Sequence, residues 1–227
     1  MSQASLQNNS SDWRESLERE VEEQFKDLTG AHDYRHVLRV VGNALVIGEK
    51  EGADLEVLEA AALLHDLHRV MEKKTGRIRV PEEETLPMAE KLLEKTGFPF
   101  QKTEKVLDAI KNKKSREFST EGSREQSLEA MILSDADDLD TLGAIGVARV
   151  ISHGAEHNRP IYTPGEDLSD RAYDPTASGS SMRHFHDKIL KLKDNMKTPT
   201  GKEMAEHRHD FLEMYLKEFF AEWEGRV

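Results

Sequence analysis

A helix that is apolar on nearly every side and ends in a histidine and an aspartate constrains this chain more than any other feature. It is expected over residues 55–71, after the N-cap Asp54, and its apolar residues are Val57, Leu58, Ala61, Ala62 and Leu64. A helix without a polar face is usually buried at the centre of a fold. His65 and Asp66 therefore enter the core, where polar side chains need partners.

Helical periodicity continues through the rest of the chain. No segment alternates with period two, and no internal repeat occurs. Apolar residues at helical spacing predict further helices at 12–28, 33–50, 82–96, 100–113, 124–135, 138–152, 182–196 and 201–224. The sequence therefore predicts an all-α fold.

Two segments lack this periodicity. Residues 1–11 are rich in Ser, Gln and Asn and are expected to form a disordered tail, which leaves 12–227 as a single helical domain. Residues 154–180 contain several Gly and Pro residues and no apolar period, which predicts a loop of about 25 residues. Loops of that length are often functional, and this one could act as a lid over a site.

The composition excludes several classes of protein. The net charge is −12 and the pI about 5.3, which argues against binding to a nucleic-acid polymer. The absence of cysteine excludes disulfides, thiolate metal sites and cysteine catalysis. No apolar run reaches the roughly 20 residues of a membrane span, and the polar N-terminus has no apolar signal region. We therefore expect a cytoplasmic protein without a membrane partner.

His36 and Asp137 complete a candidate metal site around His65 and Asp66. His36 lies on the preceding predicted helix, and helices joined by a short loop pack antiparallel, so the two histidines can meet. Asp137 comes from the acidic run SDADDLD. Two imidazoles and two carboxylates suit Mn, Fe, Ni, Co, Mg or Zn and leave coordination positions for water or substrate.

These motifs resemble those of the HD-domain superfamily of metal-dependent phosphohydrolases. The matching runs are HVLRV from His36, ALLHD ending at Asp66, and DADDLD from Asp135 to Asp140. Blocks such as AHDYRHVLRV, LGAIGVAR and RHFHDKILKLKDNMKT extend the resemblance over roughly residues 28–224. They are similar to a subfamily of small bacterial-type HD hydrolases that includes a manganese-dependent nucleoside triphosphate pyrophosphohydrolase. The resemblance implies an HD-type helical bundle with manganese as the metal.

The resemblance also implies a small phosphorylated substrate, with nucleoside triphosphate cleaved to monophosphate and pyrophosphate as the first choice. Nucleoside monophosphates and alarmone nucleotides stay open. Asp66, Asp135 or Asp140 would accept a proton, and the face shared by Lys188 and Lys191 would meet the phosphates. No acidic residue directly follows His65-Asp66, and the stretch IKNKKSREFS has no histidine, so we expect one metal ion.

Several alternatives remain open from the sequence. The chain could be a nucleotide- or metal-binding regulatory module without turnover, or an oxygenase on the same helical scaffold, although the latter generally needs two irons and more ligands than this sequence offers. A direct role for His32 and Asp33 in the site competes with a plain turn and an N-cap for the second helix. The oligomeric state is also open, with a homodimer as one option.

Overall fold

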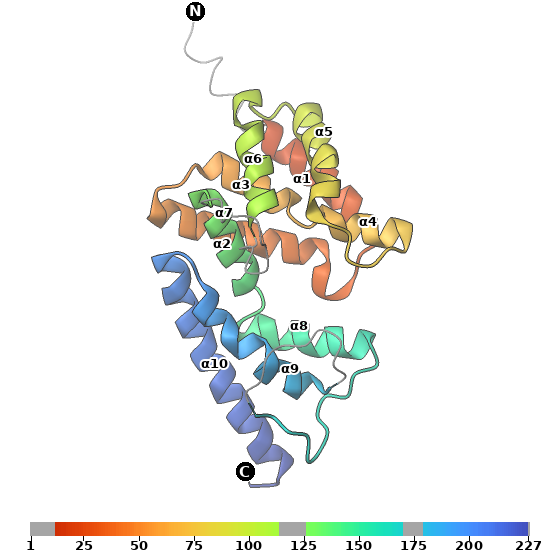
Figure 1. Ribbon diagram of the computed structural model, residues 1–227, viewed down its shortest axis with the longest axis vertical. Helices are drawn as coiled ribbons and strands as arrows, with labels where there is room; N and C mark the ends of the chain where they lie inside the picture. Colours follow the sequence, from red (N-terminus) through yellow and green to blue (C-terminus); the bar gives the residue numbers. More distant parts are fainter. Residues whose placement is uncertain (1–11, 114–125, 170–178, 227) are drawn as a thin grey trace, which may run out of the picture. The chain divides into compact units, whose positions relative to one another are not determined.

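The computed structural model describes residues 12–113, 126–169 and 179–226, and every regular element in these ranges is helical (Figure 1). The all-α prediction is thus confirmed. The predicted disordered tail, residues 1–11, lies outside the described residues. The chain divides into two compact units, one ending at Ala136 and the other beginning at Asp137.

The first unit contains helices α1 to α6 and most of α7. The last residues of α7, from Asp137, belong to the second unit. These helices are α1 (Asp12–Phe25), α2 (Tyr34–Glu51), α3 (Leu55–Leu64), α4 (Leu67–Thr75), α5 (Leu86–Thr96), α6 (Phe100–Asn112) and α7 (Leu128–Leu139). Two 3₁₀ turns join them, η2 (Gly30–His32) before α2 and η3 (Glu82–Thr85) before α5.

Helix α3 is the centre of this unit, as its apolar sequence predicts. It packs against α2, α6 and α1, and its residues from Leu58 to Leu64 are buried except for Glu59. Gly48 lets α2 approach α3 closely, because a Cβ at this position would lie 2.3 Å from Cδ1 of Leu58. This approach brings the helix that carries His36 against the helix that precedes His65.

The predicted helix over 55–71 is wrong as a single element. Helix α3 ends at Leu64, Asp66 leaves the helical conformation at φ −106° and ψ 18°, and α4 begins at Leu67. Adjacent residues on one continuous helix point about 100° apart. The break removes that constraint, so His65 and Asp66 can both turn toward α2.

The second unit contains α8 (Gly143–Glu156), α9 (Ser181–Asp187), the 3₁₀ helix η4 (Ile189–Asn195) and α10 (Pro199–Trp223). Helix α8 packs against α10 and α9, and η4 packs against α9 and α10. The predicted helix at 182–196 is broken at Lys188, whose φ of −132° and ψ of −56° end α9.

The long loop predicted at 154–180 starts later than expected, because α8 continues to Glu156. Residues 157–169 contain no helix, and residues 170–178 lie outside the described part of the chain, so the lid function remains a prediction. Among the helices that the structure describes, none combines the length and the apolar character needed to cross a bilayer.

Candidate metal centre

The N-terminus of α2 positions His36. Asp33 is the N-cap of this helix, and its carboxylate accepts a hydrogen bond from the backbone N–H of His36 at 2.9 Å. The capping role expected for Asp33 is therefore present. His36 lies in the first turn with its side chain fully buried. The N-cap therefore fixes the backbone of His36 at the start of α2.

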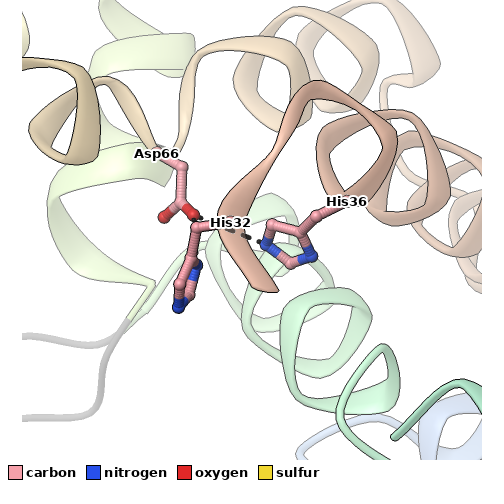
Figure 2. Close-up of side chains that lie close together, drawn as sticks. All are labelled: His32, His36 and Asp66. Atoms are coloured by element: carbon pink, nitrogen blue, oxygen red, sulfur yellow. Dashed lines mark hydrogen bonds and ion pairs between the residues drawn. The ribbon is translucent and has the colours of Figure 1, made fainter. Parts of the chain in front are cut away.

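Asp66 is the carboxylate on which the histidines converge (Figure 2). Its Oδ2 atom lies 3.1 Å from Nδ1 of His32 and 3.4 Å from Nε2 of His36. The three side chains come from η2, α2 and the α3–α4 break, and together they offer ligand atoms close enough to hold one metal ion. His32, left open by the sequence, thus lies beside the predicted ligands.

His65 presents a defined ring nitrogen to the same carboxylate. Its Nδ1 atom lies 2.7 Å from the carbonyl oxygen of Ala62, which can only accept, so Nδ1 carries the proton. Its Nε2 atom faces Oδ1 of Asp66 at 3.5 Å. A ring lone pair and a carboxylate oxygen repel each other unless a cation lies with them, either a second proton or a metal ion. The hydrogen bond to Ala62 is the type that orients histidine ligands in metal sites.

The electrostatic environment of Asp66 favours its ionised form. Burial alone would raise its pKa, but the charge of His65, hydrogen bonds from His32 and His36, and the ammonium of Lys113 hold that pKa well below its usual range. A buried carboxylate that stays ionised among imidazoles is suited to bind a cation.

Two further residues, His68 and Lys113, adjoin Asp66, and a third, Glu82, contacts Lys113. Nδ1 of His68 and Nζ of Lys113 lie 3.8 Å and 3.7 Å from Oδ1 of Asp66, and Lys113 also reaches Oε1 of Glu82 at 3.6 Å. Burial lowers the pKa of His68, which favours its neutral form. The position of His68 three residues after His65 is a signal for its place near the site, whereas no spacing signal links Lys113 or Glu82 to His65-Asp66.

The remaining predicted site residues lie in α7 or in the second unit. Asp135 is buried in α7, and Asp137 is the residue directly after Ala136 in the same helix. Asp140 follows the end of α7, and its carboxylate lies 3.1 Å from the guanidinium of Arg149.

Lys188 and Lys191 lie where α9 gives way to η4, and both are half-buried. The backbone N–H of Lys191 donates to the carbonyl of Lys188 at 3.1 Å. This bond places the two lysines in one backbone turn, with Lys188 directly before η4.

Comparison with known proteins places the region of this centre in a known family. The HD domain family model matches residues 33–142, which include all four predicted ligands. The YpgQ protein of Bacillus subtilis strain 168 is 33% identical over 198 residues, which is 87% of this chain and 87% of YpgQ. The relationship thus extends well beyond the matched domain.

Two solved structures resemble this chain over nearly its whole length. YpgQ from Bacillus subtilis in complex with ADP is 28% identical, with a TM-score of 0.68 over 91% of this chain and 95% of YpgQ. An HD-superfamily hydrolase from Bacillus thuringiensis is 31% identical, with a TM-score of 0.70 over 93% of this chain and 96% of that one. Sequence and structure together show that this chain belongs to the HD-domain superfamily of metal-dependent phosphohydrolases.

Proposed function

We propose that this protein is a nucleotide phosphohydrolase that uses one divalent metal ion and cleaves nucleoside triphosphates to monophosphate and pyrophosphate. The observation that carries the proposal is the buried carboxylate of Asp66 with the rings of His32, His36 and His65 turned toward it. The solved complex of YpgQ with ADP supports a nucleotide as the ligand class.

We assign His36, His65, Asp66 and Asp137 as the metal ligands. The donor set fits a hard or borderline divalent ion, because it combines neutral imidazole nitrogens with carboxylate oxygens. The ring of His65 supports the assignment, since its Nδ1 atom donates to the carbonyl of Ala62 and its Nε2 atom is directed at a carboxylate oxygen of Asp66. Manganese is our first choice of ion.

The assignment of Asp137 draws support from Asn43. Asn43 follows His36 by seven residues, which is about two turns of α2, so the two lie on one face of that helix. Its Nδ2 atom donates to the carbonyl oxygen of Ala136 at 3.2 Å. Asp137 is the next residue in α7, and the hydrogen bond therefore fixes the backbone beside it.

The proposed reaction forms a bond from a water oxygen to the α-phosphorus and breaks the bond from that phosphorus to the oxygen bridging to the β-phosphate. A divalent ion at the site supplies Lewis acidity, which lowers the pKa of a water molecule and polarises a phosphoryl oxygen. Lys188 and Lys191 are assigned to the phosphates, where their charges would stabilise the leaving pyrophosphate.

A residue of the chain must accept the proton that the water loses. The low pKa of Asp66 makes it a weak base and suits a metal ligand better. Asp140 already faces the guanidinium of Arg149. We therefore assign the proton to Asp135 in α7 or to His32, whose side chain is one-third exposed beside Asp66.

The test is to incubate the purified protein with Mn²⁺ and a panel of nucleoside mono-, di- and triphosphates, and to assay phosphate and pyrophosphate separately. Pyrophosphate release from triphosphates that stops on chelation of the metal is the expected result. His65→Ala, measured in parallel, distinguishes turnover at this site from a contaminating phosphatase. Nucleotide binding without release of either product would identify a binding module instead.

A further inference from the structure

Lys113 is a buried cation at the C-terminal end of α6. Its residue surface is 1% exposed, and it is among the largest fully buried side chains of the described chain. Lysine is almost never buried to this degree unless its charge is paired. Its Nζ atom lies between two carboxylates, 3.7 Å from Oδ1 of Asp66 and 3.6 Å from Oε1 of Glu82.

The groups around this ammonium are those that bind metal ions. Asp66 and Glu82 contribute carboxylate oxygens from side chains that are 4% and 10% exposed. His68 contributes Nδ1, which lies 3.8 Å from Oδ1 of Asp66 and has no hydrogen-bond partner in the part of the chain that the structure describes. Two carboxylates and an imidazole suit a divalent cation, yet the cation that lies between the carboxylates is the chain's own.

Lys113 contacts one proposed metal ligand, Asp66, through one of its two carboxylate oxygens. Oδ2 of Asp66 faces His32 and His36, whereas the ammonium of Lys113 and the ring of His65 both approach Oδ1 of the same carboxylate. Lys113 therefore adds positive charge beside the proposed metal site without taking the place of a ligand. Without that charge, two buried carboxylates, those of Asp66 and Glu82, would lie near the end of α6 without this compensating cation.

We propose that the ammonium of Lys113 acts as a permanent second cation of the centre. It compensates part of the negative charge of Asp66 and Glu82, occupies the space that a second divalent ion would take, and thereby limits the centre to one metal ion per chain. Lys113 is a positioning residue in this scheme, because it acts through Asp66 rather than on substrate. The inference rests on the proposed metal site.

The experiment counts metal ions rather than turnover. Purified full-length variants are titrated with Mn²⁺, bound metal per chain is measured by elemental analysis, and electron paramagnetic resonance reports whether two ions are close enough to couple. Wild type should bind one ion with an uncoupled spectrum. Lys113→Met keeps an unbranched side chain but removes the charge, so it should bind a second ion and show a coupled spectrum.

Three further variants make the result specific to this charge. Lys113→Arg should retain one ion, because it keeps the positive charge, and Lys111→Met should do so because Lys111 is exposed on the same helix. Combining Lys113→Met with Glu82→Gln should return the count to one, since a carboxylate of the second site is lost. Lys113→Gln provides the same count if Lys113→Met does not fold, as judged by circular dichroism.

The outcomes separate this inference from the proposed function. A wild-type chain that binds no ion would remove the metal site itself, and with it this inference. If wild type and a folded Lys113→Met each bind one uncoupled ion, the metal site stands and the role given to Lys113 is wrong. Two bound ions in wild type would also contradict the role given to Lys113, because its ammonium would then not exclude a second metal ion.

Discussion

Nδ1 of His65 lies 2.7 Å from the carbonyl oxygen of Ala62, one turn back along α3. This hydrogen bond commits one ring nitrogen to the backbone and leaves the other, Nε2, directed at Asp66. The backbone of the central helix thus sets the tautomer of the histidine. Because a backbone carbonyl cannot be removed by a side-chain substitution, the centre is tested most directly by replacing the ring itself.

His65→Ala should lower the affinity for Mn²⁺ by at least about a hundredfold and abolish hydrolysis, because a proposed ligand is lost. The fold should persist, with a cost of about 1–3 kcal/mol from the partners left unpaired in the core. Isothermal titration with Mn²⁺, turnover and thermal unfolding measure the three effects. His207→Ala changes an exposed histidine of α10 and serves as the control. Full turnover in His65→Ala would exclude His65 as a ligand.

His32→Gln should have a smaller effect than His36→Ala. His32 is one-third exposed and contacts Oδ2 of Asp66, so we expect it to orient this carboxylate or accept a proton rather than to hold the ion alone. Loss of such a contact typically lowers metal affinity or activity by about 10- to 100-fold. Comparison of kcat with Mn²⁺ affinity separates the two roles: an affinity loss as large as that of His36→Ala would make His32 a ligand.

The sequence predicts the helical class and the family, but not every contact of the centre. Periodic apolar residues and the order of His36, His65 and Asp66 are local signals that do not depend on how the chain folds. The break between α3 and α4 carries no Gly or Pro, so periodicity alone extends the helix through it. The ion pairs of Lys113 join segments that are far apart in the sequence, and no fixed residue spacing predicts such contacts.

Two glycines of α2 should respond oppositely to alanine. Gly42 is exposed, and a Cβ added there would meet no atom within 4 Å, so Gly42→Ala should stabilise the chain by up to about 1 kcal/mol through helix propensity. At Gly48 the new Cβ would meet the buried side chain of Leu58, and repacking should cost about 1–3 kcal/mol. Urea unfolding measures both. Equal stabilisation by the two variants would show that α2 and α3 do not depend on this close approach.

His184 should make the stability of the chain fall with decreasing pH. Burial, and then the charges of Lys188, Arg159 and His153, lower its pKa from 6.5 to about 4, while Asp187 acts in the opposite direction. Between these two values the unfolded chain binds a proton that the folded chain does not, so this contribution is unfavourable below about pH 6.5 and grows until about pH 4.

The effect of His184 should reach at most about 2 kcal/mol near pH 5. His184→Asn removes the titrating group, and its unfolding free energy should therefore decrease less than that of wild type between about pH 7.5 and about pH 5. His207→Asn, at an exposed position, should retain the wild-type decrease. Parallel pH dependences for wild type and His184→Asn would show that the buried ring does not contribute.

Lys188 and Lys191 provide the test of where the phosphates bind. The backbone hydrogen bond from Lys191 to the carbonyl of Lys188 places the two lysines in one turn at the start of η4, although the continuous helix expected from the sequence is absent. If they meet phosphates, Lys188→Ala and Lys191→Ala should each reduce kcat/KM by about 10- to 100-fold, because a charged hydrogen bond contributes roughly 1.5–3 kcal/mol. The reduction should be similar for every nucleotide base, and bound Mn²⁺ should not change. Lys202→Ala, at an exposed position on α10, is the matched control. A loss that depends strongly on the base would place the nucleoside at these lysines instead, and wild-type kinetics in both variants would show that these side chains do not touch substrate.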